Sequence, residues 1–192
     1  MPVAAAARTI TSLDELTLRR AQRGDERAWR DLVALYQQPI QALVWRLLIG
    51  RSRHRVEDLV QETFVRVLRA LPGFDLDGPA TLSTWMLTIA TRLALNELRR
   101  DEPVALDIEP IAPGRTDAEL DRRRLGAAIA AGVASLGEGQ RAVFVLREYH
   151  DLDYQQIAEI LEIDLGTVKS RLARARAALR DHLDVALGGR HA

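Results

Sequence analysis

The fold of this chain is decided in its last third, where residues 153–183 read DYQQIAEILEIDLGTVKSRLARARAALRDHL. The apolar spacing predicts a short helix, a tight turn, and a longer second helix that Asp164 is suited to cap. At about 100° per residue, one face of the second helix carries only apolar residues: Val168, Leu172, Ala175, Leu179 and Leu183. On the first helix, Ile157, Ala158 and Leu161 share a side, and the small Ala158 permits close helix approach. This pattern predicts a helix-turn-helix.

The opposite face of the second helix is polar and basic. It carries Thr167, Ser170, Arg171 and Arg174, and residues 165–180 hold five basic side chains and no acidic one. A basic helix face is often merely solvated. Hydroxyls mixed with arginines, however, suit phosphate anchoring together with contacts to base edges. The helix is therefore predicted to enter a DNA major groove.

Composition excludes several classes of protein. The 192 residues are 47% hydrophobic and 28% charged, which is typical of a globular chain with one or two small domains. There is no cysteine, and the four histidines lack ligand spacing, so we expect no disulfide, metal or other cofactor. No apolar run reaches the roughly 20 residues of a membrane span, and the start of the chain lacks the features of a signal peptide. We therefore expect no membrane insertion and a cytoplasmic location.

The formal net charge is zero, but charge is unevenly distributed. Residues 1–100 hold 15 basic and 11 acidic side chains, whereas residues 101–116 hold one basic and four acidic ones. Affinity for nucleic acid must then come from local patches.

Helical periodicity extends over almost the whole chain, and no segment alternates like a strand. Residues 101–116, with three prolines, cannot continue a helix and predict an extended linker. The expected fold is all-α, with two small helical domains joined by this flexible linker. The expected division is a flexible N-terminus at 1–12, domains at 13–100 and 117–187, and a tail at 188–192. The expected helices cover 14–23, 25 to about 50 with a kink or junction at Pro39, 56–71, 83 or 84 to 100, 117–136, 140–149, and the two of the helix-turn-helix.

Two helices of the first domain have distinctive faces. Residues 56–71 place an apolar set on one side, namely Val56, Leu59, Val60, Phe64, Val67, Leu68 and Leu71. The other side gathers Asp58, Glu62, Arg66 and Arg69, which indicates either a solvated face or a groove for a specific partner. The helix from 83 or 84 to 100 is apolar nearly all round except for the strip Thr88, Arg92, Asn96 and Arg99. Such a strip suits a helix lying across a nucleic-acid backbone.

Two blocks of sequence carry a family resemblance. DLVQETFVRVLRAL at 58–71, the loop to Trp85 and IATRLALNELRR at 89–100 resemble region 2 of bacterial extracytoplasmic-function (ECF, group 4) sigma factors of the sigma-70 family. LGEGQRAVFVLR at 136–147, through GTVKSRLARAR at 166–176, resembles region 4 of the same family. The resemblance spans roughly residues 17–183. It implies an alternative-sigma initiation factor that binds core RNA polymerase, directs it to minus-35 and minus-10 promoter elements, helps open the duplex, and is not an enzyme.

The resemblance also assigns residues to partners. It implies that core polymerase is bound by Asp58, Gln61, Glu62, Arg66 and Arg69. For minus-10 DNA it implies Phe74, Asp75, Thr84, Trp85, Thr88, Arg92, Asn96, Arg99 and Arg100. For minus-35 DNA it implies Thr167, Lys169, Ser170, Arg171, Arg174 and Arg176. It further implies an anti-sigma factor as a partner that holds the protein silent.

This sequence departs from the family pattern at three places. Glu162 stands where relatives usually have glycine in the helix-turn-helix turn, Thr91-Arg92 where they commonly have Arg-Asn, and Asn96 where they have Asp. Two other functions fit parts of the chain. A free-standing helix-turn-helix regulator would explain residues 117–183 but leave the first hundred unexplained, and a helical adaptor would bind proteins only.

Overall fold

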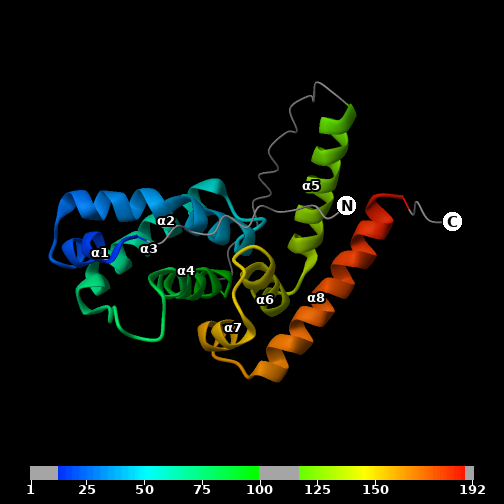
Figure 1. Ribbon diagram of the computed structural model, residues 1–192. Coiled ribbons are helices and arrows are strands. Elements are labelled where there is room, and N and C mark those ends of the chain that lie inside the picture. Colours follow the sequence, from blue (N-terminus) through cyan, green and yellow to red (C-terminus); the bar gives the residue numbers. More distant parts are fainter. Residues whose placement is uncertain (1–12, 100–116, 189–192) are drawn as a thin grey trace.

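A computed structural model describes residues 13–99 and 117–188, and this part of the chain is all-α, as predicted (Figure 1). The first group of helices comprises α1 (Glu15–Gln22), α2 (Glu26–Leu47), α3 (Arg53–Ala70), a 3-10 turn η1 (Leu71–Gly73) and α4 (Leu82–Leu98). The second comprises α5 (Asp117–Ser135), α6 (Glu138–Glu148), α7 (Tyr154–Leu161) and α8 (Leu165–Ala186). The predicted linker, N-terminus and most of the tail lie outside the described residues. None of the described helices is apolar over a stretch long enough to cross a membrane.

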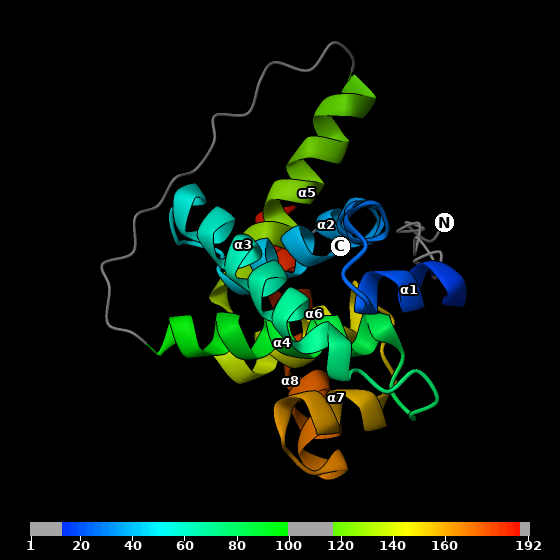
Figure 2. The ribbon, with the colours of Figure 1, turned by 90° about the vertical axis from the view of Figure 1, so that its left-hand side faces the viewer.

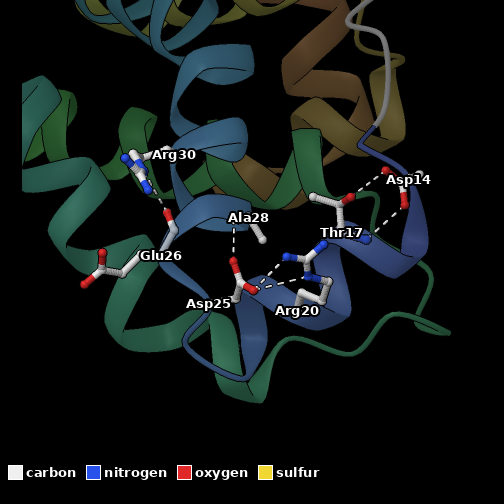
Figure 3. A network of polar contacts seen from close by, with 7 residues as sticks. All are labelled: Asp14, Thr17, Arg20, Asp25, Glu26, Ala28 and Arg30. Atoms are coloured by element: carbon white, nitrogen blue, oxygen red, sulfur yellow. Dashed lines mark hydrogen bonds and ion pairs between the residues drawn. The ribbon is translucent and has the colours of Figure 1, made fainter.

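Side-chain caps explain where the first helices begin. Asp14 accepts a hydrogen bond from the Thr17 amide, and Asp25 accepts one from the Ala28 amide while also pairing with Arg20 (Figure 3). Ser52 caps α3 in the same way, so this helix begins three residues before the predicted Val56. Of the kink or junction expected at Pro39, the junction is wrong, because α2 continues through this proline as one helix. The kink stays a prediction.

Helix α2 forms the centre of the first group and packs against α1, α3 and α4. Its stripe of Leu32, Ile40, Leu43 and Leu47 is completely buried. Leu68, predicted to lie on the apolar side of α3, is instead 48% exposed. It follows the fully buried Val67 by one residue, and about 100° of helical rotation carries it past the side that α2 and α4 cover.

The second group is the predicted helix-turn-helix with two supporting helices. α7 begins with a capping box between Asp153 and Gln156, and α8 packs against α5, α6 and α7. Val168, Leu172 and Ala175 are buried as predicted. Gly132 lets α5 approach α8, since a methyl group at this position would lie 2.4 Å from Leu179 Cδ1.

The two groups of helices are in direct contact. α6 packs against the C-terminal part of α2, and α7 packs against α4 (Figures 1 and 2). The Arg141 guanidinium of α6 donates a hydrogen bond of 3.0 Å to the Leu47 carbonyl oxygen at the end of α2. Arg46 of α2 lies over the ring of Tyr149, 4.1 Å from its centroid.

Candidate nucleic-acid interface

The N-terminal half of α8 presents the predicted DNA-reading face. Asp164 caps this helix, accepting hydrogen bonds from the amide (2.7 Å) and hydroxyl (2.6 Å) of Thr167. The Thr167 hydrogen bonds lower the pKa of the Asp164 carboxyl. Ser170 and Arg174 are exposed one and two turns further on, and the Arg174 guanidinium donates to the Ser170 carbonyl and hydroxyl. Three polar side chains are thus arranged along one accessible ridge.

The other predicted DNA-binding residues of α8 differ in their exposure to solvent and in their contacts with α6. Lys169 is exposed, whereas Arg171 is half-buried beside the first turn of α6, where a methyl group at Gly139 would lie 2.9 Å from its Nη1. Arg176 forms an ion pair of 2.6 Å with Glu148 of α6. Hydrogen bonding to Glu148 raises the pKa of Arg176. In this structure Arg176 therefore fastens α8 to α6, a contact that the periodicity of α8 could not indicate.

The turn between α7 and α8 contains the family departure at Glu162. This residue ends α7 in the left-handed conformation, with φ 55° and ψ 47°. Glycine adopts this conformation without the steric cost that a Cβ imposes. The chain makes the turn with a glutamate whose side chain is 73% exposed.

The polar strip predicted on α4 lies along one side of this helix, and most of its residues are exposed. Arg92, Asn96 and Arg99 are exposed, while Thr88 is half-buried and donates its hydroxyl hydrogen to the Thr84 carbonyl at 2.8 Å. Arg92 Nη2 lies 2.7 Å from Glu162 Oε1, so the strip touches the helix-turn-helix turn. Arg100 lies outside the described residues.

An aromatic pair stands where the loop 74–81 meets α4. The rings of Phe74 and Trp85 are 4.9 Å apart with an interplanar angle of 39°. Gln22 of α1 anchors the start of this loop by donating to the carbonyl oxygens of Leu71 (3.1 Å) and Phe74 (2.8 Å). Sequence reasoning missed Gln22, because nothing in the pattern of α1 indicates a bond to a residue about 50 positions later.

The remaining predicted residues of this region are less accessible or locally bonded. Thr84 is 8% exposed, and its hydroxyl contacts Thr81 Oγ1 at 2.9 Å and Gln156 Nε2 at 3.3 Å. Asp75 accepts a hydrogen bond from the Asp77 amide, which shapes the loop. Thr84 is therefore placed to support the site rather than to project from it.

The predicted polymerase-binding face lies along the outer side of α3. Gln61, Glu62, Arg66 and Arg69 are exposed, and Asp58 is half-buried. Glu62 and Arg66 pair at 2.7 Å one helical turn apart. The exposed Val65 and Leu68 extend the same helix surface with apolar area. A mixed charged and apolar face of this kind suits a protein partner.

Comparisons with known proteins find relatives for both groups of helices. Residues 32–103 match the model of sigma-70 region 2, and residues 127–179 match that of sigma-70 region 4. The ECF RNA polymerase sigma factor SigE of Mycolicibacterium smegmatis is 35% identical over 170 residues, which cover 83% of this chain and 64% of that protein. SigW of Bacillus subtilis, also an ECF RNA polymerase sigma factor, is 33% identical over 86% of this chain and 94% of its own length.

The fold is also found among solved structures. CnrH, determined in complex with the cytosolic domain of CnrY, matches with a TM-score of 0.63 and 28% identity over 90% of this chain and 97% of that chain. The sigma factor RpoE of Bartonella quintana, in complex with the anti-sigma factor NepR, shares the fold with a TM-score of 0.65 at 22% identity.

Region 2 precedes region 4 in one all-α chain, and this combination defines a sigma-70-type transcription initiation factor. Within this class, the chain belongs to the ECF RNA polymerase sigma factors. The resemblance inferred from the sequence blocks at 58–100 and 136–176 is thereby confirmed, and a free-standing helix-turn-helix regulator is not favoured.

Proposed function

We propose that this chain binds core RNA polymerase, directs it to promoters with minus-35 and minus-10 elements, and helps open the duplex. The observation that carries the proposal is the presence of two polar surfaces suited to nucleic acid on one scaffold: the ridge of α8 and the strip of α4 with its aromatic pair. We propose that the protein acts in the cytoplasm and catalyses no covalent step.

For the minus-35 element, α8 enters the major groove with its N-terminal half. The Thr167 amide and hydroxyl are bonded to Asp164, which fixes the start of the helix. Ser170, Arg171 and Arg174 then provide one hydroxyl and two guanidinium groups. Arginine binds phosphate and guanine edges with paired donors, so this ridge can combine anchoring with base contacts.

For the minus-10 element, region 2 receives a base that has left the duplex. Flipping a base costs a few kcal/mol, and the cost falls when the base stacks on an aromatic side chain. Phe74 and Trp85 provide aromatic surface at the mouth of the loop, while Arg92, Asn96 and Arg99 line the strip along which the strand backbone runs.

For core polymerase, the α3 face of Asp58, Gln61, Glu62, Arg66 and Arg69 forms the docking surface. We also propose that an anti-sigma factor binds this protein, since CnrH is found in complex with the cytosolic domain of CnrY, and RpoE in complex with the anti-sigma factor NepR.

The proposal is tested by run-off transcription with core polymerase and a cognate promoter. We expect transcript only when both proteins are present. Arg171→Glu combined with Arg174→Glu should abolish transcription that depends on the minus-35 element. Arg180→Glu, an exposed charge reversal on the same helix outside the proposed contact, is the matched control and should retain activity.

Three outcomes would contradict the proposal. Failure of the wild-type chain to bind core polymerase would overturn it. Operator binding by the chain without polymerase would support a free-standing regulator, and wild-type behaviour of the double arginine variant would support an adaptor that binds proteins only.

A further inference from the structure

The loop 74–81 is tied at its start to a helix that lies far from it in the sequence. Gln22, the last residue of α1, donates hydrogen bonds from its Nε2 to the carbonyl oxygens of Leu71 (3.1 Å) and Phe74 (2.8 Å). A glutamine amide group has two hydrogens to donate, so one nitrogen can serve both acceptors. Gln22 therefore holds the first and the last residue of the turn from Leu71 to Phe74 at the same time.

The turn joins a buried residue to one with less support. Leu71 is completely buried, and its carbonyl also accepts a hydrogen bond from the Phe74 amide at 3.0 Å. Between them Pro72 and Gly73 are exposed, and a methyl group on Gly73 would meet nothing within 4 Å. Exposed turns with little packing open readily. The bonds from Gln22 therefore tie Phe74 to the core at a point where packing of the turn itself does not.

The two rings of the aromatic pair are held in different ways. Trp85 lies in the first turn of α4, a helix capped by Thr81, whose Oγ1 accepts a hydrogen bond from the Thr84 amide at 3.1 Å. The position of Trp85 is thus set by a capped helix. The Phe74 ring, with its centroid 4.9 Å away, belongs to the turn. Because the Gln22 bond fixes the Phe74 carbonyl, it restricts the backbone that carries this ring.

Charge gives this loop no help in binding DNA. Residues 74–81 include Asp75 and Asp77 but no basic side chain. A base that enters the loop must be bound mainly by stacking and hydrogen bonds, which need a defined geometry. An aromatic pair that is already ordered avoids part of the entropy cost of forming the site when the base arrives. The order of the turn that carries Phe74 should therefore affect binding of the minus-10 element.

We propose that Gln22 is a positioning residue of the minus-10 site, which holds Phe74 beside Trp85 before the flipped base arrives. Gln22 does not touch the base and acts through the carbonyl oxygens of the turn. The inference rests on the proposed function, because it assigns the aromatic pair to the minus-10 element. It extends the site to α1, a helix with none of the residues that the sequence assigned to DNA or polymerase.

Two DNA probes separate this role from general damage to the fold. Both are made from a promoter that supports run-off transcription with the wild-type chain. The first probe is a duplex that contains the minus-35 element and ends upstream of the minus-10 element. The second has the same duplex followed by the single-stranded non-template strand of the minus-10 element. The holoenzyme formed with core polymerase is titrated with each probe.

Two substitutions of Gln22 remove and restore its donors. Gln22→Met keeps the length of the side chain without its donors. It should weaken binding of the second probe about three- to tenfold, as loss of an ordinary hydrogen bond does, and leave the first unchanged. Gln22→Lys supplies an ammonium group with N–H donors and should restore binding of the second probe. Such a rescue is not expected for a side chain that merely fills space.

Gln37 provides matched controls. It is exposed on α2 outside the proposed contacts, so Gln37→Met and Gln37→Lys make the same changes away from the turn. Comparing each Gln22 variant with its Gln37 counterpart removes the general effect of added positive charge on DNA affinity. Hydrogen exchange of the free proteins gives a second readout. The Phe74 amide should exchange faster in Gln22→Met than in Gln37→Met, and its protection should return in Gln22→Lys.

Three results would overturn the role of Gln22 alone. They are equal weakening of both probes by Gln22→Met, unchanged binding of the second probe by this variant, and no rescue by Gln22→Lys relative to Gln37→Lys. The proposed function would survive each of them, because the wild-type holoenzyme still binds both probes. Failure of the wild-type chain to bind core polymerase would instead refute the proposed function, and this inference with it.

Discussion

Arg55 of α3 holds the carboxylate of Glu97 of α4 with two hydrogen bonds, Nε to Oε1 at 2.5 Å and Nη2 to Oε2 at 2.6 Å. The Glu97 side chain is 3% exposed, so the paired guanidinium replaces the water that this charge has lost. Glu97 lies directly between Asn96 and Leu98 near the end of the proposed minus-10 strip. The ion pair therefore fixes the position of the strip against α3.

Removing one partner of this pair should destabilise the protein strongly. We expect Arg55→Met to lower the free energy of unfolding by about 3 kcal/mol, because it removes the opposite charge and two hydrogen bonds from a buried carboxylate. Urea denaturation followed by circular dichroism measures the change. Glu57→Gln, which affects the exposed α3 pair between Arg53 and Glu57, is the control and should cost less than about 0.5 kcal/mol. If both variants lost the same amount of unfolding free energy, burial of Glu97 would not explain the effect of Arg55→Met.

His150 should make stability depend on pH. Burial, with a smaller contribution from the charge of Arg46, lowers the pKa of His150 to about 4. Its Nε2 is shut off from solvent and has no hydrogen-bond partner among residues 13–99 and 117–188. The unfolded chain has the ordinary value of 6.5, so its histidine takes up a proton first as pH falls. The stabilisation is fully present above pH 6.5 and is lost between about pH 6.5 and 4.

The size of this effect follows from the pKa difference. At about 1.4 kcal/mol per pKa unit, the loss between these pH values is on the order of 3 kcal/mol. His150→Leu should flatten the profile of unfolding free energy in this interval. A slope that persists in the His150 variant would show that another group titrates.

Gly132 and Gly126 of α5 should respond oppositely to alanine. A Cβ on Gly132 would lie 2.4 Å from Leu179 Cδ1 and 3.0 Å from His182 Cδ2, whereas one on Gly126 meets nothing within 4 Å. Gly126→Ala should stabilise the protein by up to about 1 kcal/mol through helix propensity. The unfolding free energy of Gly132→Ala should be about 1–3 kcal/mol lower than that of Gly126→Ala, because the added methyl group overpacks the contact between α5 and α8. Thermal unfolding of the two variants gives the comparison, and equal melting temperatures would refute the close approach.

Glu162→Gly should stabilise the isolated chain. The left-handed conformation costs an ordinary residue about 1 kcal/mol, which glycine avoids. The lost ion pair with Arg92 is exposed and offsets only part of this gain. Asp151, with φ 52°, is the second residue of this kind in the described part of the chain, and Asp151→Gly should give a similar gain. A clear loss of unfolding free energy in Glu162→Gly would mean that the pair with Arg92 outweighs the strain.

Local features of this fold were accessible from the sequence because they depend on neighbouring residues. The cap at Asp164, the buried face of Val168, Leu172 and Ala175, and the exposed Arg174 each follow from helical periodicity within one or two turns. Periodicity was less reliable for residues at the boundary between the buried and the exposed face of a helix. Periodicity places Leu68 on the apolar side of α3, but its exposure depends on how much of that side α2 and α4 cover.

The sequence by itself determined the helical class, the helix-turn-helix and, apart from positions such as Leu68 and Thr84, the residues that each helix turns outward. The tertiary structure alone decided which of these outward residues meet. Arg141 bonds to Leu47 across 94 residues, and Arg92 reaches Glu162 across 70. Such contacts depend on the angles and distances between helices, which are set by packing of the whole core, whereas helix formation depends mainly on residues three or four positions apart.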